Sequence, residues 1–129
     1  HLAAMVAAAG WAGRPPIRSL ATVSGLHDLA PLLGANPNAW LGLTAARARA
    51  LSPAHHPPPR DMPVLVALGG AETPAFRAQS DLFADALRAR GNDVRRLDVD
   101  GADHFEVIAG FGAAGHPLFG ALADLVARA

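Results

Sequence analysis

Stretches of apolar and mixed residues alternate along the chain in a way that predicts a layered α/β fold. Residues 64–68 (VLVAL) form a continuous apolar run, which is long enough for a strand buried on both faces and too short for a helix. Two glycines end the run, and Thr73 followed by Pro74 is typical of the start of a helix. The pattern therefore predicts a strand, a tight turn and a helix, with the carboxylate of Glu72 in the turn.

The remaining segments continue this alternation of helices and strands. Residues 2–9 predict an apolar helix, and residues 17–24 predict a second strand. Residues 75–90 have the periodicity of an amphipathic helix, residues 94–99 that of a half-exposed edge strand, and residues 117–127 that of a helix covering the sheet. This order favours a parallel sheet with helices on its faces, in one α/β domain.

An irregular excursion separates the first two predicted strands. Residues 26–61 break into short helical pieces at glycines and prolines, and such excursions often shape a substrate pocket. Leu26, His27, Trp40 and Leu43 could line an aromatic pocket there, although a tryptophan in this setting is more often part of the core.

Composition narrows the range of functions. The chain has 129 residues, of which 51% are hydrophobic and 17% charged, with a formal net charge of zero, so neither a disordered chain nor a nucleic-acid-binding surface is indicated. No cysteine is present, which excludes disulfides and thiolate metal sites. The apolar start of the chain is shorter than a membrane span, and His55 and His56 lack a third ligand at suitable spacing. We expect no membrane, metal or cofactor.

Two chemically interesting residues follow successive predicted strands. Glu72 comes after one strand and His104 after the next, so adjacent parallel strands would bring them together at one edge of the sheet. A carboxylate bound to an imidazole is the acid–base part of a Ser-His-acid triad. From spacing alone, a simpler interpretation is slightly favoured, with Glu72 stabilising a helix N-terminus and His104 an ordinary loop residue. Asp103 is expected to shape the loop.

Several segments resemble one enzyme family in the same order along the chain. Residues 69–80 (GGAETPAFRAQS) and 101–107 (GADHFEV) resemble the acid and histidine segments of the kynurenine formamidases (arylformamidases), which are α/β-hydrolases. Residues 24–29 (SGLHDL) and 51–53 (LSP) match that family at corresponding places, and residues 1–5 (HLAAM) resemble the helix behind a G-x-S-x-G nucleophile elbow. The resemblance implies that residues 1–129 are the C-terminal part of an α/β-hydrolase domain.

The resemblance also implies an activity and a site. It implies a cytoplasmic hydrolase of tryptophan catabolism that converts N-formylkynurenine to kynurenine and formate, with a small formyl or acyl substrate, no cofactor and a possible homodimer. His104 would be the base and Glu72 its acid, preferred about three to one over Asp28, which also ends a strand. Relatives in animals have aspartate at the position of Glu72, but glutamate serves in other hydrolase triads. A carboxylesterase of the same fold and a truncated, non-catalytic module are the alternatives.

The nucleophile is the part of the triad that the sequence does not supply. The four serines, Ser19, Ser24, Ser52 and Ser80, all lie outside a G-x-S-x-G motif. The resemblance places the serine a few residues before His1, so we expect the chain to be a fragment that is inactive alone. Such a fragment would leave the strand at residues 17–24 unpaired on one side, which favours association or poor solubility.

Overall fold

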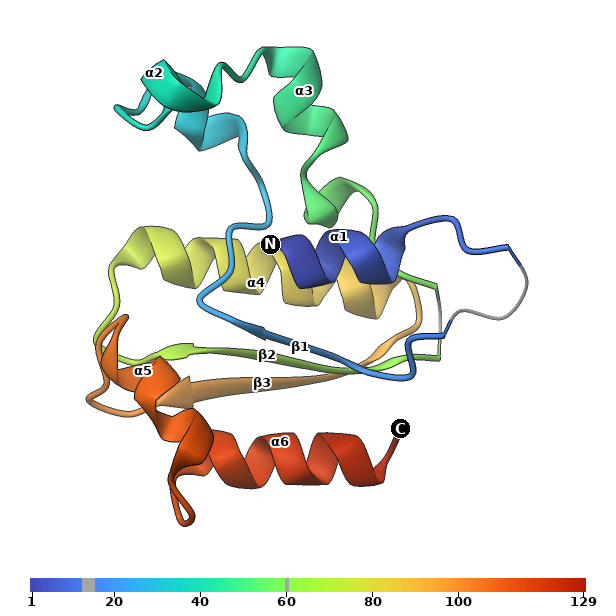
Figure 1. Cartoon of the computed structure of the whole chain (residues 1–129), viewed down its shortest axis with the longest axis vertical. Coiled ribbons are helices and arrows are strands. Elements are labelled where there is room, and N and C mark those ends of the chain that lie inside the picture. Colours follow the sequence, from blue (N-terminus) through green and yellow to red (C-terminus); the bar gives the residue numbers. More distant parts are fainter. Residues whose placement is uncertain (13–15, 60) are drawn as a thin grey trace.

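A three-stranded parallel sheet forms the middle layer of the computed structural model, which describes residues 1–12, 16–59 and 61–129 (Figure 1). The strand order is β1 (Leu20–Val23), β2 (Pro63–Gly69) and β3 (Asp93–Val99), with both neighbouring pairs parallel. The predicted α/β arrangement is confirmed, although β1 is shorter than the eight residues of the predicted strand.

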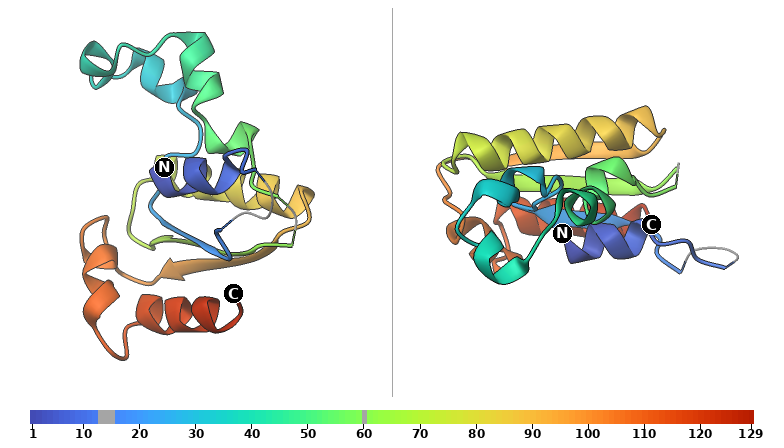
Figure 2. Two further views of the ribbon diagram at one scale, coloured as in Figure 1. Left: turned by 45° about the vertical axis from the view of Figure 1, so that its right-hand side comes forward. Right: turned by 90° about the horizontal axis from the view of Figure 1, so that it is seen from above.

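Helices cover both faces of this sheet, as Figures 1 and 2 show. Helices α1 and α4 lie on one face, α6 lies on the other, and α5 sits at the end of the sheet toward which β2 and β3 point. The α-helices are α1 (Leu2–Ala8), α2 (Asn38–Leu41), α3 (Ala45–Ala50), α4 (Pro74–Ala89), α5 (Glu106–Ala109) and α6 (Pro117–Ala127), and three 3₁₀ turns occur at Ala30–Gly34, Pro53–His55 and Gly110–Gly112.

Strand β2 is central because its side chains reach two separate cores. Val64 and Val66 pack with α1 and α4 on one face, whereas Leu65 and Ala67 pack with α6 on the other. All four are at most 1% exposed, which is why the sequence here shows an unbroken apolar run. The two neighbouring strands then hold β2 in register, with Val66 paired to Thr22 on one side and to Arg96 on the other.

Helix α4 agrees with its predicted amphipathic pattern, with two local differences. Phe83 and Leu87 are fully buried, and Gly91 follows the helix with a φ of 89°, which glycine adopts without strain. Thr73 occupies the N-cap position as predicted, but its hydroxyl makes no capping hydrogen bond. Phe76, which the pattern assigns to the core, is only half-buried and lies against the ring of His104.

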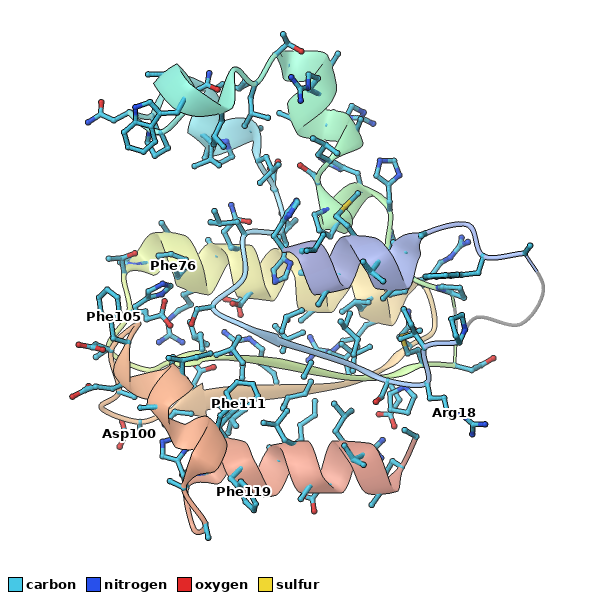
Figure 3. All side chains as sticks on the ribbon, viewed as in Figure 1. Arg18, Phe76, Asp100, Phe105, Phe111 and Phe119 are labelled. Carbon is cyan, nitrogen blue, oxygen red and sulfur yellow. The ribbon has the colours of Figure 1, made fainter. Side chains whose placement is uncertain are left out.

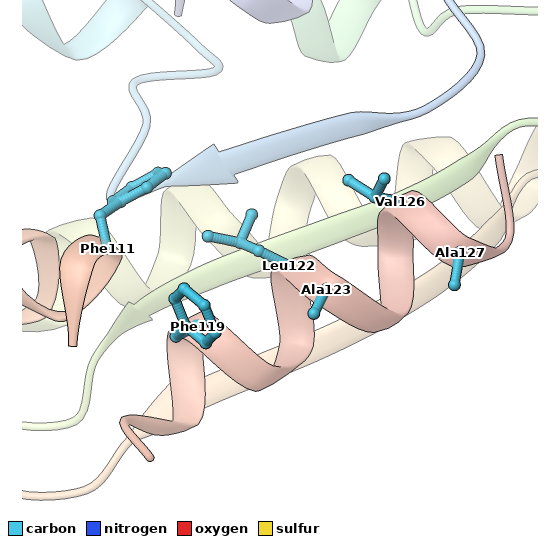
Figure 4. A pocket seen from close by; sticks show the side chains of 6 residues that line it. All are labelled: Phe111, Phe119, Leu122, Ala123, Val126 and Ala127. Carbon is cyan, nitrogen blue, oxygen red and sulfur yellow. The ribbon is translucent and has the colours of Figure 1, made fainter. Parts of the chain in front are cut away.

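Other apolar residues lie outside the core. Val126, assigned by its spacing to the covering stripe of α6, is 72% exposed, whereas Leu118 and Leu125 are buried. An apolar groove of about 450 Å³ runs along this exposed side of α6, as Figure 4 shows, and is lined by Phe111, Phe119, Leu122, Ala123, Val126 and Ala127.

The excursion at residues 26–61, of which residue 60 lies outside the described part, projects beyond the sheet (Figure 1). Trp40 on α2 is 84% exposed, so the expectation of a core position is wrong for this residue. His27 is fully buried and stacks on Phe83, with ring centroids 4.0 Å apart, so it belongs to the core and not to an open pocket wall. Among the described residues, no helix combines the length and the apolarity needed to cross a bilayer.

Candidate functional site

Two glycines at the end of β2 bring the acid and histidine loops together. A Cβ on Gly69 would lie 2.3 Å from the carbonyl oxygen of Ala102, so only glycine allows the loop after β3 to approach this closely. The backbone N–H groups of Gly70 and Ala71 donate to the carbonyls of Val99 and Ala102, at 2.8 and 3.0 Å. The loop that carries His104 is thereby fixed beside the turn that carries Glu72.

The carboxylate of Glu72 is held by three donors from three parts of the chain. Its Oε1 accepts hydrogen bonds from the backbone N–H of Gly69, at 2.9 Å, and from the hydroxyl of Ser24. Its Oε2 lies 2.9 Å from Nδ1 of His104. None of these partners is an N–H group of the first turn of α4, so the contacts differ from those of a helix-capping acid.

The surroundings of Glu72 decide its charge. Its side chain is only 1% exposed, and burial alone would raise the pKa of the carboxyl group. The hydrogen bonds from Ser24, Gly69 and His104, together with the charge of a protonated His104, outweigh burial and hold the pKa below its ordinary value of 4.5. Glu72 is therefore an anion at neutral pH.

His104 combines one fixed nitrogen with an accessible ring. Because Glu72 is ionised, Nδ1 carries the proton and donates to Oε2, which leaves Nε2 as the basic nitrogen of the neutral ring. The side chain is 46% exposed and lies between two phenylalanines, Phe76 at 4.7 Å and Phe105 at 5.5 Å between ring centroids. Figure 3 shows both phenylalanines at the same end of the sheet, where β2 and β3 terminate.

Two small hollows border the ring of His104. One, of about 170 Å³, is lined by Val23, Ser24, His104, Phe105 and Ile108. The other, of about 200 Å³, is lined by Ala71, Glu72, Thr73, Phe76, Asp103, His104 and Phe105. A small acyl group can therefore approach the imidazole from solvent, beside largely apolar side chains.

Asp103 shapes the loop and does not contact the ring of its neighbour. Its carboxylate accepts hydrogen bonds from the N–H groups of Phe105 and Glu106, both at 2.8 Å. Glu106 in turn accepts from the N–H of Asp103 at 2.9 Å, so the two residues bind each other's backbone N–H groups in the loop that leads into α5. The loop-shaping role predicted for Asp103 is confirmed.

Asp28, the alternative acid, belongs to a different cluster. Its carboxylate accepts from the N–H of Ala30 at 2.9 Å and from the Ser52 hydroxyl at 3.4 Å, and lies 3.9 Å from Nε2 of His55. The structure thus brings Glu72, and not Asp28, to His104. In the described part of the chain, no group of three His, Asp or Glu side chains is arranged to bind a metal ion.

The sequence did not indicate the part that Ser24 takes in this site. Ser24 follows β1, and its hydroxyl donates to the acid instead of facing Nε2 of the histidine. The only sequence signal was the position of Ser24 at the end of a predicted strand. In the structure this strand pairs with β2, which places Ser24 at the same edge of the sheet as Glu72. Each of the three strands is therefore followed by one residue of the site: Ser24, Glu72 and His104.

The structure has a parallel sheet covered by helices on both faces, and an acid–histidine pair lies beyond the carboxyl ends of two neighbouring strands. This α/β arrangement is consistent with part of an α/β-hydrolase fold. No family model matches the chain. Among curated proteins, kynurenine formamidase of Danio rerio is 34% identical over 116 residues and that of Salmo salar 33% over 117 residues. Both alignments cover 84% of this chain.

These similarities confirm a kynurenine formamidase-like relationship, as the sequence segments indicated. The chain spans 40% of the length of each of these two relatives. More than half of each relative therefore has no counterpart in these 129 residues.

Proposed function

We propose that this chain supplies the histidine and the acid of a hydrolase that converts N-formylkynurenine to kynurenine and formate. The observation that carries the proposal is the 2.9 Å contact between Nδ1 of His104 and the buried carboxylate of Glu72 at the ends of adjacent parallel strands. The relationship to the kynurenine formamidases supports the choice of substrate. A cytoplasmic site of action and a possible homodimer belong to the same proposal.

The acid–histidine pair suits general base and general acid catalysis. With its Nδ1 proton directed at Glu72, His104 accepts the proton of a serine hydroxyl at Nε2 while the serine oxygen bonds to the formyl carbon. The imidazolium is stabilised by the carboxylate and returns the proton to the departing aniline nitrogen of kynurenine as the C–N bond breaks. Water then releases formate from the formyl-serine by the same proton transfers.

The serine in this proposal lies outside the 129 residues. The hydroxyl of Ser24 is engaged by Glu72, and Ser52 and Ser80 are fully buried. Ser19 precedes β1, at the end of the parallel sheet opposite to Glu72 and His104, so none of the four serines presents a hydroxyl to Nε2 of His104. The greater length of the two relatives supports a nucleophile in another segment of a longer protein.

The proposal is tested in the full-length protein by changing each candidate acid separately. We expect His104→Ala and Glu72→Gln each to lower kcat on N-formylkynurenine by about 10³-fold or more, since both remove an orienting or proton-accepting group. Asp28→Asn is the matched control and should leave kcat within about threefold. Loss of activity in Asp28→Asn with normal activity in Glu72→Gln would refute the assignment of the acid.

Comparison of substrates separates the formamidase from an esterase of the same fold. We expect kcat/KM to be higher on N-formylkynurenine than on a p-nitrophenyl ester, with both activities abolished by His104→Ala. A preference for the ester would favour the carboxylesterase alternative, and the absence of both activities would favour a non-catalytic module.

A further inference from the structure

Ser24 has an unusual backbone conformation at the edge of the site. Its φ of 50° lies in the left-handed region, which a side chain with a Cβ adopts only at a conformational cost. Its N–H nevertheless continues the ladder of β1 by donating to the carbonyl of Ala67 at 2.9 Å, and Gly25 follows directly. Glycine would suit the φ at position 24 better, so the serine side chain needs a separate explanation.

The contacts of the hydroxyl supply that explanation. Ser24 donates to Oε1 of Glu72, the oxygen that also accepts from the N–H of Gly69 at 2.9 Å. Glutamate has one more side-chain torsion than aspartate, so a single contact to His104 would leave its carboxylate several orientations. Two donors on Oε1 select the orientation in which Oε2 faces Nδ1 of His104.

We propose that Ser24 is a positioning residue, whose hydroxyl holds the Glu72 carboxylate in the orientation that presents Oε2 to His104. The left-handed turn at Ser24 aims the hydroxyl at the acid, and the pairing of β1 with β2 sets the distance between them. This inference rests on the proposed function, because it assigns Ser24 to the acid of that site. Ser24 acts through Glu72, to which its hydroxyl donates.

The backbone at Ser24 permits a test that separates the hydroxyl from the turn. Ser24→Gly removes the hydroxyl and relieves the positive φ, whereas Ser24→Ala removes the hydroxyl and retains the strain. In the full-length protein we expect both variants to lower kcat on N-formylkynurenine by about 10- to 100-fold, with KM changed less than twofold. If the turn alone matters, Ser24→Gly keeps the wild-type kcat and the inference is wrong.

A matched control and a double-mutant cycle complete the kinetic test. Ser80 is buried on α4, and its hydroxyl has no hydrogen-bond partner among the described residues, so Ser80→Ala should leave kcat unchanged. Adding Ser24→Gly to Glu72→Gln should cause no further loss, because the hydroxyl acts through the carboxylate. A full additional loss in the double variant would contradict action through Glu72.

A spectroscopic measurement distinguishes failure of this inference from failure of the proposed function. Carboxyl ¹³C NMR should show the pKa of Glu72 rising in Ser24→Gly, since one donor to the ionised form is lost. An unchanged titration of Glu72 would overturn the role of Ser24 whatever the activity. If the titration shifts but Glu72→Gln and His104→Ala retain full activity, the proposed function fails while the hydrogen bond stands.

Discussion

Lowering the pH from 7.5 to 5 should destabilise the chain because His27 is buried in its neutral form. The ring is 0% exposed and stacks on Phe83, and among the described residues neither ring nitrogen has a hydrogen-bond partner. Burial lowers the pKa of His27 from 6.5 to about 3. Protonation is therefore favoured in the unfolded chain and opposed in the folded one.

The sign and the size of the effect follow from proton linkage. A histidine whose pKa is lowered by folding contributes full stability above pH 6.5, and this contribution decreases as the pH falls from 6.5 toward 3. In the unfolded chain, His27 has its ordinary pKa of 6.5, which lies about 1.5 units above pH 5. Protonation at pH 5 therefore stabilises the unfolded chain by roughly 2 kcal/mol relative to the folded one. This value depends on the ordinary pKa and hardly on the folded one, provided that the folded pKa stays well below 5.

The assay is urea unfolding of the wild type and of His27→Leu at both pH values, followed by circular dichroism. Leucine has nearly the volume of histidine and does not titrate, so the difference between the two pH dependences isolates His27. We expect the wild type to lose about 2 kcal/mol more than the variant between pH 7.5 and pH 5. His27→Phe provides a second non-titrating variant that can stack on Phe83.

Equal pH dependences in the wild type and in both variants would refute the reasoning. They would mean that His27 either titrates normally in the folded chain or reaches solvent through fluctuations of its surroundings. Glu72 cannot produce the predicted loss, because its lowered pKa affects stability only below its ordinary value of 4.5.

Further predictions concern the strand ends, the free surface and the acid. Gly69→Ala places a Cβ 2.3 Å from the Ala102 carbonyl, so kcat/KM of the full-length protein should fall at least about tenfold; Gly10→Ala, which meets nothing within 4 Å, is the control. The isolated chain should associate in size-exclusion chromatography, because the edge of β1 and the apolar groove on α6 are both uncovered. Val126→Lys should reduce this association, and a monodisperse wild-type monomer would contradict the prediction. The stability cost of Glu72→Gln should be largest above pH 4.5 and shrink as the pH falls through the lowered pKa of Glu72, as measured by urea unfolding; a cost independent of pH would contradict ionisation of the acid.

The elements that were predicted well from the sequence are those in which the pattern of apolar residues agrees with the surroundings of the element. β2 is buried on both faces, so its apolar run was sufficient, and β3 is half-exposed, as expected of a strand at the end of the strand order. Helix α4 has a single apolar side with Phe83 and Leu87 at helical spacing. In each case local pattern and tertiary environment agree.

The predictions that failed concern residues whose environment depends on distant segments. Trp40 is apolar but lies on a short helix that projects from the sheet, so no neighbouring element covers it. His27 is polar but fully buried, because its ring stacks on Phe83 of α4. Composition and spacing contain no information about which elements meet at these positions.

The acid–histidine pair was predictable from topology, whereas the support for the acid was not. Residues that follow two consecutive strands are expected to lie close together if the strands are parallel neighbours. β2 and β3 are such neighbours, which brings Glu72 and His104 together. The hydrogen bond from Ser24 depends instead on a left-handed φ and on the exact end of β1, neither of which has a sequence signature for a serine.

One physical arrangement explains why three residues so far apart form one site. Ser24, Glu72 and His104 follow β1, β2 and β3, so their mutual distances are set by the two parallel pairings and not by local loop structure alone. A 2.9 Å contact tolerates little displacement, and a shift of about 1 Å between neighbouring strands would break it. The double core around β2 resists such a shift, because Val66 and Leu65 are fixed on opposite faces by different helices. The packing of the central strand is therefore a condition for the geometry of the acid, and through the acid for the geometry of His104.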